Sequence, residues 1–352
     1  MENSDIQFST LPAKQGVLGL IVLNRPQALN ALSFEMLSAM KSQLQLWQDD
    51  EQVKAVIVKS SSSRAFCAGG DIRALYENRL RQWGASHPYF SLEYRLNQFL
   101  HHFTKPYIAF LDGITMGGGV GISLHGSHTV ASERCQWAMP ESKLGFFPDV
   151  GASYHLSRAP DMLGWYLALS GRTIDVATAF DLRIVNSVIA SEHWPDVEQA
   201  LQNTVFAKNA HDTVSDVLQS FHTMPEPCPL GEYYPLIRRC FSQPSCAEII
   251  EALAFENTDW CLELREELLS RSPFSLKLIF EQLHRAVNMT FDEVIEQDLV
   301  LVNHFVRDAD FYEGIRAAVI DKDQSPQWTQ NELTHISHED VLHYFHPIEA
   351  KV

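Results

Sequence analysis

"PYIAFLDGITMGGGVGIS", residues 106–123, joins a strand pattern to a run of glycines that leads into a helical segment. Residues 106–113 are rich in β-formers, and similar runs recur at 17–23, 54–60 and 128–132, separated by segments with helical spacing. Alternating strand and helix patterns are typical of a sheet covered by helices. The sequence therefore predicts an α/β core.

Two segments have the periodicity of amphipathic helices. Residues 33–50 carry apolar side chains at steps of three and four, and Ser33 is suited to cap the N-terminus of that helix. Residues 86–103 show a second apolar stripe, with Glu93 beside it. The stripes expected to be buried are Phe34, Leu37, Met40, Leu44 and Trp47 in the first helix, and Leu92, Leu96, Phe99 and Phe103 in the second.

The last half of the chain has a different pattern. From about residue 160 helical periodicity dominates, and a Pro-rich loop at 223–235 interrupts it. We take this loop as the junction between two parts. The expected organisation is an α/β core over residues 1–222 and a mainly helical region over residues 223–352.

Composition excludes several classes of function. The 352 residues are 45% hydrophobic and carry a formal net charge of −17, which argues against an extended nucleic-acid surface. The six cysteines form no CxxC pair and no metal-ligand spacing with histidine, so we expect free thiols and no metal. No apolar run approaches 18 residues, and the N-terminus has neither a secretory nor a transit pattern. We therefore expect no membrane association and a cytoplasmic location.

Two glycine turns are candidates for binding an anionic atom. The run at 112–123 lacks the Gly-Lys-Ser/Thr of a P-loop and matches a dinucleotide fingerprint poorly. A second pair lies in "RAFCAGGDIRALYE", residues 64–77, also between a strand and a helix. The glycines could serve only close packing, but two sets of backbone N–H donors are also what an oxyanion hole for thioester chemistry requires. Cys67, beside this second turn, has no base near it in sequence and is read as a packing residue.

Two carboxylates lie in "MPESKLGFFPDVG", residues 139–151, in unusually apolar surroundings. Taken singly, Glu141 is an ordinary loop acid and Asp149 a helix N-cap. Next to Phe146 and Phe147, however, a carboxylate would be desolvated and better suited to act as a base. The fifteen histidines show no metal-binding or catalytic array and receive no chemical role.

Together these motifs resemble the crotonase, or enoyl-CoA hydratase/isomerase, superfamily, and within it the 3-hydroxyisobutyryl-CoA hydrolase branch, which acts in valine catabolism. The resemblance rests on "AFCAGGDI", "KPYIAFLDGITMGGGVGIS" and "MPESKLGFFPDVG", and it extends to "IVLNRPQALNALS", "GRTIDVATAFDLRIVNSVI" and "DFYEGIRAAVIDKDQSPQW". It implies a crotonase-like spiral of ββα turns with a helical C-terminal region, and it implies an acyl-CoA substrate.

The resemblance also assigns roles to residues. Gly70 and Gly118 match the two oxyanion donors, and Glu93 matches an acid that contacts the substrate. Arg73 stands where relatives carry a cation facing a CoA phosphate, and Arg25 stands near the adenosine end. Ala68 and Asp71 are the remaining substrate-binding candidates, although Asp71 on its own pattern is better explained as a helix N-cap or first-turn acid.

The departures from the hydratase pattern favour hydrolysis. Hydratases use two glutamates; Glu141 matches one of them, but Gly121 replaces the other, and Asp149 replaces a usual glycine. The implied activity is hydrolysis of 3-hydroxyisobutyryl-CoA or a similar short 3-hydroxyacyl-CoA. Glu141 would activate water or attack the carbonyl, Asp149 would orient water or the substrate hydroxyl, and Glu93 would bind that hydroxyl.

Two alternatives remain open at this stage. One is an enoyl-CoA hydratase or isomerase with a displaced acid, for which Asp149 is the candidate. The other is a non-catalytic structural homologue, against which the joint presence of Glu141, Asp149 and both glycine turns argues. No metal or redox cofactor is needed, because CoA is part of the substrate, and a homo-oligomer is compatible with the resemblance.

Overall fold

The computed structural model describes residues 5–78, 88–206 and 209–348, which fold into two compact units. The first, called the sheet unit, comprises Met1–Gly70, Arg95–Trp137 and Ile174–Gly231. The second, called the helical unit, comprises Asp71–Tyr94, Ala138–Thr173 and Glu232–Val352. The chain therefore passes between the units several times, and one passage lies at 231–232, inside the Pro-rich loop. The contiguous division at residue 222 stays a prediction.

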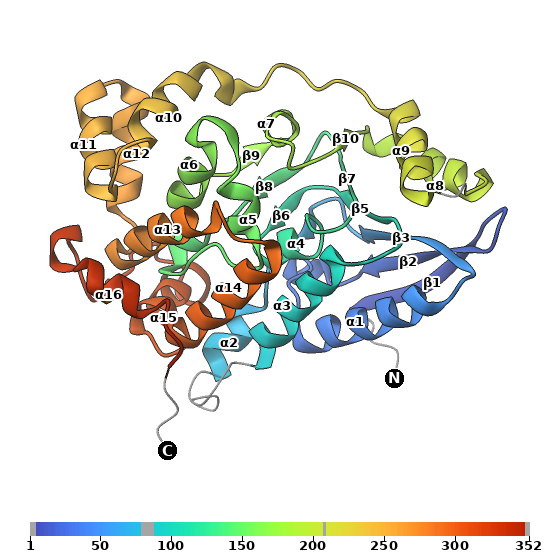
Figure 1. Ribbon diagram of the computed structural model, residues 1–352, viewed down its shortest axis with the longest axis horizontal. Coiled ribbons are helices and arrows are strands. Elements are labelled where there is room, and N and C mark those ends of the chain that lie inside the picture. Colours follow the sequence, from blue (N-terminus) through green and yellow to red (C-terminus); the bar gives the residue numbers. More distant parts are fainter. Residues whose placement is uncertain (1–4, 79–87, 207–208, 349–352) are drawn as a thin grey trace. The chain divides into compact units, whose positions relative to one another are not determined.

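A six-stranded sheet, ordered β1-β2-β3-β5-β7-β10, forms the framework of the sheet unit (Figure 1). β1 and β2 form an antiparallel hairpin, and the pairs from β2 onward are parallel. Parallel neighbours need crossover connections, which explains the alternation of strand and helix patterns. The strands are β1 (Ile6–Pro12), β2 (Val17–Leu23), β3 (Val53–Ser60), β5 (Tyr107–Leu111), β7 (His128–Ala131) and β10 (Ser187–Val188).

Helices pack on both faces of this sheet. Helix α1 (Phe34–Asp49) begins at Ser33, whose side chain caps it as expected. Its Trp47 lies against Gly19 of β2, where a Cβ atom would be 2.7 Å from the indole ring. On the other face, α8 (Trp194–Asn203) and α9 (Ala210–Phe221) pack on alternate strand residues. This core consists of Leu18, Leu20, Ala55, Ile57, Ile108, Phe110, Val130, Ile189, Val197, Leu201, Val214 and Leu218.

The helix expectations need two corrections. Phe34 was expected in the buried stripe of α1 but is 44% exposed, because it is the first helical residue and the stripe begins with Met36 and Leu37. Helix α3 (Pro88–His101) buries Glu93 and Leu96, whereas Leu92 and Phe99 are only half-buried. Residues 86–87 lie outside the described residues.

A second sheet, ordered β4-β6-β8-β9, positions the glycine turns. Its strands are only two or three residues long, too short to show a period, and the sequence patterns did not reveal them. β4 (Ala65–Cys67) and β6 (Ile114–Met116) are parallel neighbours, so the turns that follow them emerge at the same edge. The remaining strands are β8 (Gln136–Ala138) and β9 (Ile174–Asp175), and α7 (Val176–Asp181) follows β9.

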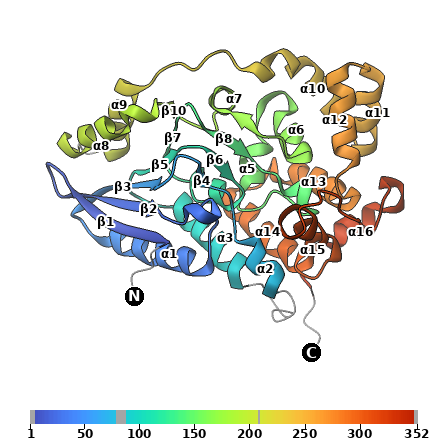
Figure 2. The same cartoon turned by 180° about the vertical axis from the view of Figure 1, so that it is seen from behind.

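The helical unit confirms the helical C-terminal region (Figure 2). Its short helix α5 packs against both α13 and α14. Among the described residues, no helix is long and apolar enough to cross a membrane. The helices are α2 (Ile72–Asn78), α5 (Ala152–Leu156), α6 (Leu163–Ser170), α10 (Tyr234–Phe241), α11 (Cys246–Glu256), α12 (Asp259–Leu269), α13 (Pro273–Ala286), α14 (Phe291–Phe305), α15 (Ala309–Ile315) and α16 (His338–His343).

Asn30 ties the loop after β2 to β4 in the sheet unit. It has a φ of 56° and is fully buried, and its amide nitrogen donates to Ser60 Oγ at 2.8 Å and to the Phe66 carbonyl at 2.9 Å. Its amide oxygen accepts the N–H of Arg25 at 2.8 Å. Asparagine tolerates the left-handed conformation, and its amide supplies both the donor and the acceptor that this site needs.

We predict that Asn30→Asp destabilises the protein by about 3 kcal/mol, because a buried carboxylate would face carbonyl oxygens that have lost their donor. Thermal unfolding followed by circular dichroism measures the effect. Asn257→Asp is the matched control, since Asn257 also has a positive φ of 49° but is exposed at the C-terminus of α11. A loss for Asn30→Asp no larger than for Asn257→Asp would contradict the proposed role of the amide.

Candidate active site

The two glycine turns of the sheet unit lie next to each other. A Cβ atom added to Gly69 would be 3.3 Å from the Met116 carbonyl oxygen and 3.6 Å from the backbone nitrogen of Gly118. Gly118 is the first residue of the single-turn helix α4 (Gly118–Gly121). Among the described residues, the N–H groups of Gly70 and Gly118 donate to no protein acceptor. Two neighbouring backbone donors are thus available, as an oxyanion hole requires.

Close packing explains why glycine occurs in these turns. Gly69 has a φ of 110°, a conformation that L side chains rarely adopt. A Cβ atom on Gly119 would lie 2.3 Å from the carbonyl oxygen of Cys67. Cys67 itself is fully buried, and its thiol contacts the Asn30 carbonyl at 3.1 Å, which agrees with a packing role. The packing and oxyanion interpretations of the glycines are therefore compatible.

In the helical unit, three carboxyl groups are buried in one cluster. Glu93, Glu141 and Asp149 are 2, 6 and 5% exposed. The hydroxyl of Tyr94 donates to Asp149 Oδ2 at 2.8 Å, and that of Tyr89 lies 3.4 Å from Glu93 Oε1. Glu141 begins the short helix η2 (Glu141–Leu144), and its Oε2 has no hydrogen-bond partner among the described residues. An unpartnered buried carboxyl oxygen is available to a ligand or to water.

Burial is the main cause of the raised pKa values in this cluster. It raises the pKa of Glu93 and of Glu141 well above the ordinary value, and the negative charge of Asp149 raises the pKa of both further. Burial also raises the pKa of Asp149 to about 7, although hydrogen bonds from Tyr94 and from its own backbone act in the opposite direction. A carboxyl group with a pKa of about 7, such as Asp149, can exchange protons at physiological pH.

Aromatic rings supply the apolar surroundings expected from the sequence. The ring of Phe146 lies 4.4 Å from that of Phe147 and 4.6 Å from that of Phe311, measured between centroids. Phe90, from the same helix as Glu93, lies 5.9 Å from Phe146. These rings give residues 139–151 apolar surroundings, and burial is the first cause of the raised pKa of Glu141 and of Asp149.

The remaining predicted substrate-binding residues make contacts within their own units. The Asp71 carboxylate accepts the N–H of Ala74 at 3.1 Å and so caps α2, as its sequence pattern indicates. The exposed Arg73 donates to the Val319 carbonyl at 2.8 Å.

In the sheet unit, the guanidinium of Arg25 donates to the Ala31 carbonyl at 2.9 Å and lies 3.6 Å from the Asp5 carboxylate. Ala68 donates its N–H to the Leu29 carbonyl at 3.0 Å. Contacts with substrate by these four residues, Ala68, Asp71, Arg73 and Arg25, stay predictions.

Sequence reasoning missed Tyr94 and Asp298. Asp298 is fully buried in α14, among Val294, Ile295, Leu301 and Val302. A charged residue at the helical spacing of an apolar stripe is a detectable signal, since buried carboxylates are rare without a specific partner. Tyr94 gave no such signal, because a tyrosine in an amphipathic helix is ordinary.

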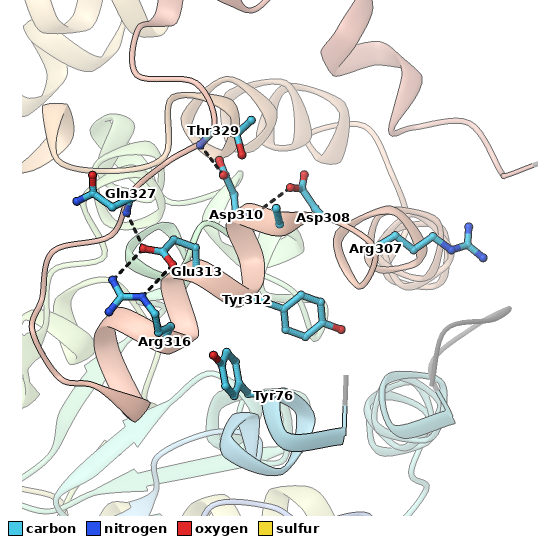
Figure 3. Close-up of a pocket in the computed structure, with 10 residues that line it drawn as sticks. Tyr76, Arg307, Asp308, Asp310, Tyr312, Glu313, Arg316, Gln327 and Thr329 are labelled. Carbon is cyan, nitrogen blue, oxygen red and sulfur yellow. Dashed lines mark hydrogen bonds and ion pairs between the residues drawn. The ribbon is translucent and has the colours of Figure 1, made fainter. Parts of the chain in front are cut away.

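A separate pocket of the helical unit, about 600 Å³ in volume, is lined by α15 and by Tyr76 of α2 (Figure 3). Several of its polar groups bind one another. Arg316 pairs with Glu313, and the carboxylate of Asp310 accepts the N–H of Thr329 at 2.8 Å. This pocket therefore lacks the unpartnered buried carboxyl oxygen that marks the acid cluster. No group of side chains suited to a metal ion occurs among the described residues.

Comparison with known proteins identifies the family. Residues 18–345 match the model of a family described as enoyl-CoA hydratase/isomerase. The mitochondrial 3-hydroxyisobutyryl-CoA hydrolase of Xenopus tropicalis is 39% identical over 340 residues, covering 95% of this chain and 88% of the relative. The human hydrolase of the same name is 36% identical over 349 residues, covering 98% of this chain and 90% of the relative.

These relatives correct the expected location. They are mitochondrial proteins, so the cytoplasmic location expected from the sequence is contradicted. That expectation relied on free thiols and on the composition of the N-terminal segment, and free thiols do not distinguish the cytosol from other reducing compartments.

A solved structure agrees with the sequence comparisons. A carnitinyl-CoA dehydratase from Mycobacterium thermoresistibile has a TM-score of 0.89 and 31% identity, covering 99% of this chain and 98% of that chain. The crotonase-like α/β fold predicted from the motifs is thereby confirmed. This chain belongs to the enoyl-CoA hydratase/isomerase family, the crotonase superfamily, as its glycine turns and acid-bearing loop indicated.

Proposed function

We propose that this protein hydrolyses 3-hydroxyisobutyryl-CoA to the free hydroxy acid and CoA. The curated relatives that match nearly the whole chain carry that activity in their names. The observation that carries the proposal in this molecule is the buried cluster of Glu93, Glu141 and Asp149, with the pKa of each raised. A role in valine catabolism is part of the same proposal.

In the proposed reaction, a water oxygen bonds to the thioester carbonyl carbon, the C–S bond breaks, and the CoA thiolate takes up a proton. Gly70 and Gly118 would donate their free N–H groups to the carbonyl oxygen as negative charge develops on it. Glu141 would either remove a proton from the water or attack the carbon itself and be released by water. Both routes give the same products.

The other two acids would act on the substrate hydroxyl and on the water. Glu93, whose raised pKa favours the neutral form, can donate a hydrogen bond to the 3-hydroxyl group. Asp149, with a pKa of about 7, can orient the water molecule and accept a proton. Arg73 and Arg25 are proposed to contact the CoA portion, and Ala68 and Asp71 are proposed to contact the substrate. We propose no metal or redox cofactor, because hydrolysis with these groups needs none.

Hydration of an enoyl-CoA is the second candidate, favoured by the similarity to a dehydratase. Hydration needs a carboxyl group on the α4 side, and Gly121 at that position has none. A non-catalytic scaffold is disfavoured, because buried carboxyl groups cost stability that a scaffold has no reason to lose. Assembly into a homo-oligomer stays a prediction.

We predict that Glu141→Gln lowers thiol release from 3-hydroxyisobutyryl-CoA by at least about 100-fold, since the amide can neither accept the proton nor attack the carbonyl. Release of free CoA thiol, followed with a thiol-reactive dye, measures it. Glu266→Gln is the control, because the side chain of Glu266 is 70% exposed. Hydration of crotonyl-CoA without thiol release by the parent protein would instead support the second candidate.

We also predict that Asp149→Asn stabilises the protein above pH 7 and not near pH 4. The pKa of Asp149 is raised from 3.8 to about 7, so the folded state resists its ionisation. The stability contributed by the neutral carboxyl is present below pH 4 and is lost as the pH rises to 7. Asparagine avoids that loss and still accepts the hydrogen bond from Tyr94.

Melting temperatures of the parent and of Asp149→Asn between pH 4 and pH 8 test this prediction, with a gain on the order of 3 °C expected at the upper end. Asp340→Asn is the control of opposite sign, because hydrogen bonds from Ser337 lower the pKa of Asp340. A gain for Asp149→Asn that is constant over this pH range would argue against ionisation as its cause.

A further inference from the structure

The turn that carries Asp149 is held in a strained conformation. Val150 has a φ of 52° and Gly151 a φ of 75°. A β-branched residue in the left-handed region costs about 1–3 kcal/mol and persists only where its surroundings enforce it. A Cβ atom at position 151 would lie 2.6 Å from the ring of Phe291, so only glycine fits there.

Two buried residues of the C-terminal helices enforce this conformation. Asp298 of α14 accepts the N–H of Gly151 on its Oδ2 at 2.9 Å. Gln282 of α13 donates to the Pro148 carbonyl at 3.0 Å and to Asp298 Oδ1 at 3.2 Å. Asp298 and Gln282 are both fully buried. The backbone is therefore held in place on both sides of Asp149. The side chain of Asp149 binds a different partner.

That partner is Tyr94, one residue after Glu93 on α3. Its hydroxyl donates to Asp149 Oδ2 at 2.8 Å, and the tyrosine is fully buried. No other side chain among the described residues donates to this carboxylate. Tyr94 therefore fixes the orientation of the Asp149 carboxylate through its Oδ2 atom.

The charges around Asp149 make this arrangement costly. The titratable groups that act on it are Glu93 and Tyr94 from α3, Glu141 from η2 and Asp298 from α14. None of them is a cation. An apolar side chain at position 298 would avoid the free-energy cost of burying a carboxyl group. Packing alone therefore does not explain why this position is an aspartate.

We propose that Tyr94 and Asp298 are positioning residues for Asp149: Asp298 locks the strained turn and Tyr94 orients the carboxylate. The proposal rests on the hydrolytic function proposed above and adds to it two residues that touch neither the substrate nor the water. Such preorganisation keeps a reacting group in productive geometry without reorganisation during the reaction.

Tyr94→Phe tests the first residue. It is expected to lower kcat for thiol release about 10- to 100-fold, since a hydrogen bond to a charged group is lost. KM should stay within about twofold, because no substrate contact is removed. The acidic limb of the kcat profile should move to higher pH, because the lost bond favoured the ionised form of Asp149.

Tyr344→Phe is the matched control. It removes a similar hydrogen bond, from Tyr344 to Asp308 Oδ2 at 2.7 Å, in the same unit but outside the acid cluster. It is expected to change melting temperature alone. If Tyr94→Phe keeps the parent's kcat and pH profile, or changes them no more than Tyr344→Phe does, the positioning role of Tyr94 is wrong.

Asp298→Asn and Asp298→Ala test the role of the second residue, Asp298. Asparagine can still accept the N–H of Gly151, so it should retain more kcat than alanine, which removes the lock. Equal kcat in the two folded variants, or parent-like kcat in alanine, would overturn the role of Asp298.

A readout independent of activity separates this inference from the proposed function. Carbon-13 NMR of labelled aspartate carboxyls, assigned with Asp149→Asn, follows the titration of Asp149 directly. Tyr94→Phe should raise that pKa whether or not the protein hydrolyses thioesters. An unchanged Asp149 titration would overturn the positioning role. The parent protein could release no thiol while Tyr94→Phe still raises the pKa of Asp149. That result would contradict the hydrolase function but support the role of the Tyr94 hydrogen bond.

Discussion

Burial of carboxyl groups on which no cation among the described residues acts is the constraint on which the helical unit depends. Glu93, Glu141, Asp149 and Asp298 are all buried, and each has its pKa raised, chiefly by the loss of solvation. Desolvating ionised groups costs several kcal/mol each unless they become neutral. The aromatic and aliphatic packing of α13, α14 and α15 has to offset that cost.

The two units carry different kinds of chemical group. The sheet unit supplies backbone donors, because parallel strands β4 and β6 end side by side and glycine lets the following turns approach within contact distance. Backbone groups in such turns hold a fixed direction and carry no net charge. The helical unit supplies side chains whose protonation can change. Fixed backbone donors suit a developing oxyanion, and titrating side chains suit proton transfer.

Local patterns predicted much of this molecule. Strands such as β2 and β3, the capped helix α1, both glycine turns and the apolar setting of Glu141 and Asp149 could be read directly, because each depends on neighbours in sequence. The contacts that position Asp149 could not. Tyr94 reaches it across 55 positions and Asp298 reaches Gly151 across 147, so only the tertiary fold brings them together. The short strands of the second sheet were missed for a similar reason, since their pairing partners define them.

The cluster is best understood as one titrating system. Glu93, Glu141 and Asp149 interact strongly enough that a proton lost by one raises the cost of losing the next. Near neutral pH the cluster therefore holds fewer charges than carboxyl groups. In the proposed reaction, a neutral member would donate a hydrogen bond to the substrate hydroxyl while a charged member would accept a proton from water. In the described part of the chain, α4 carries no carboxyl group, because it consists of Gly118, Gly119, Val120 and Gly121.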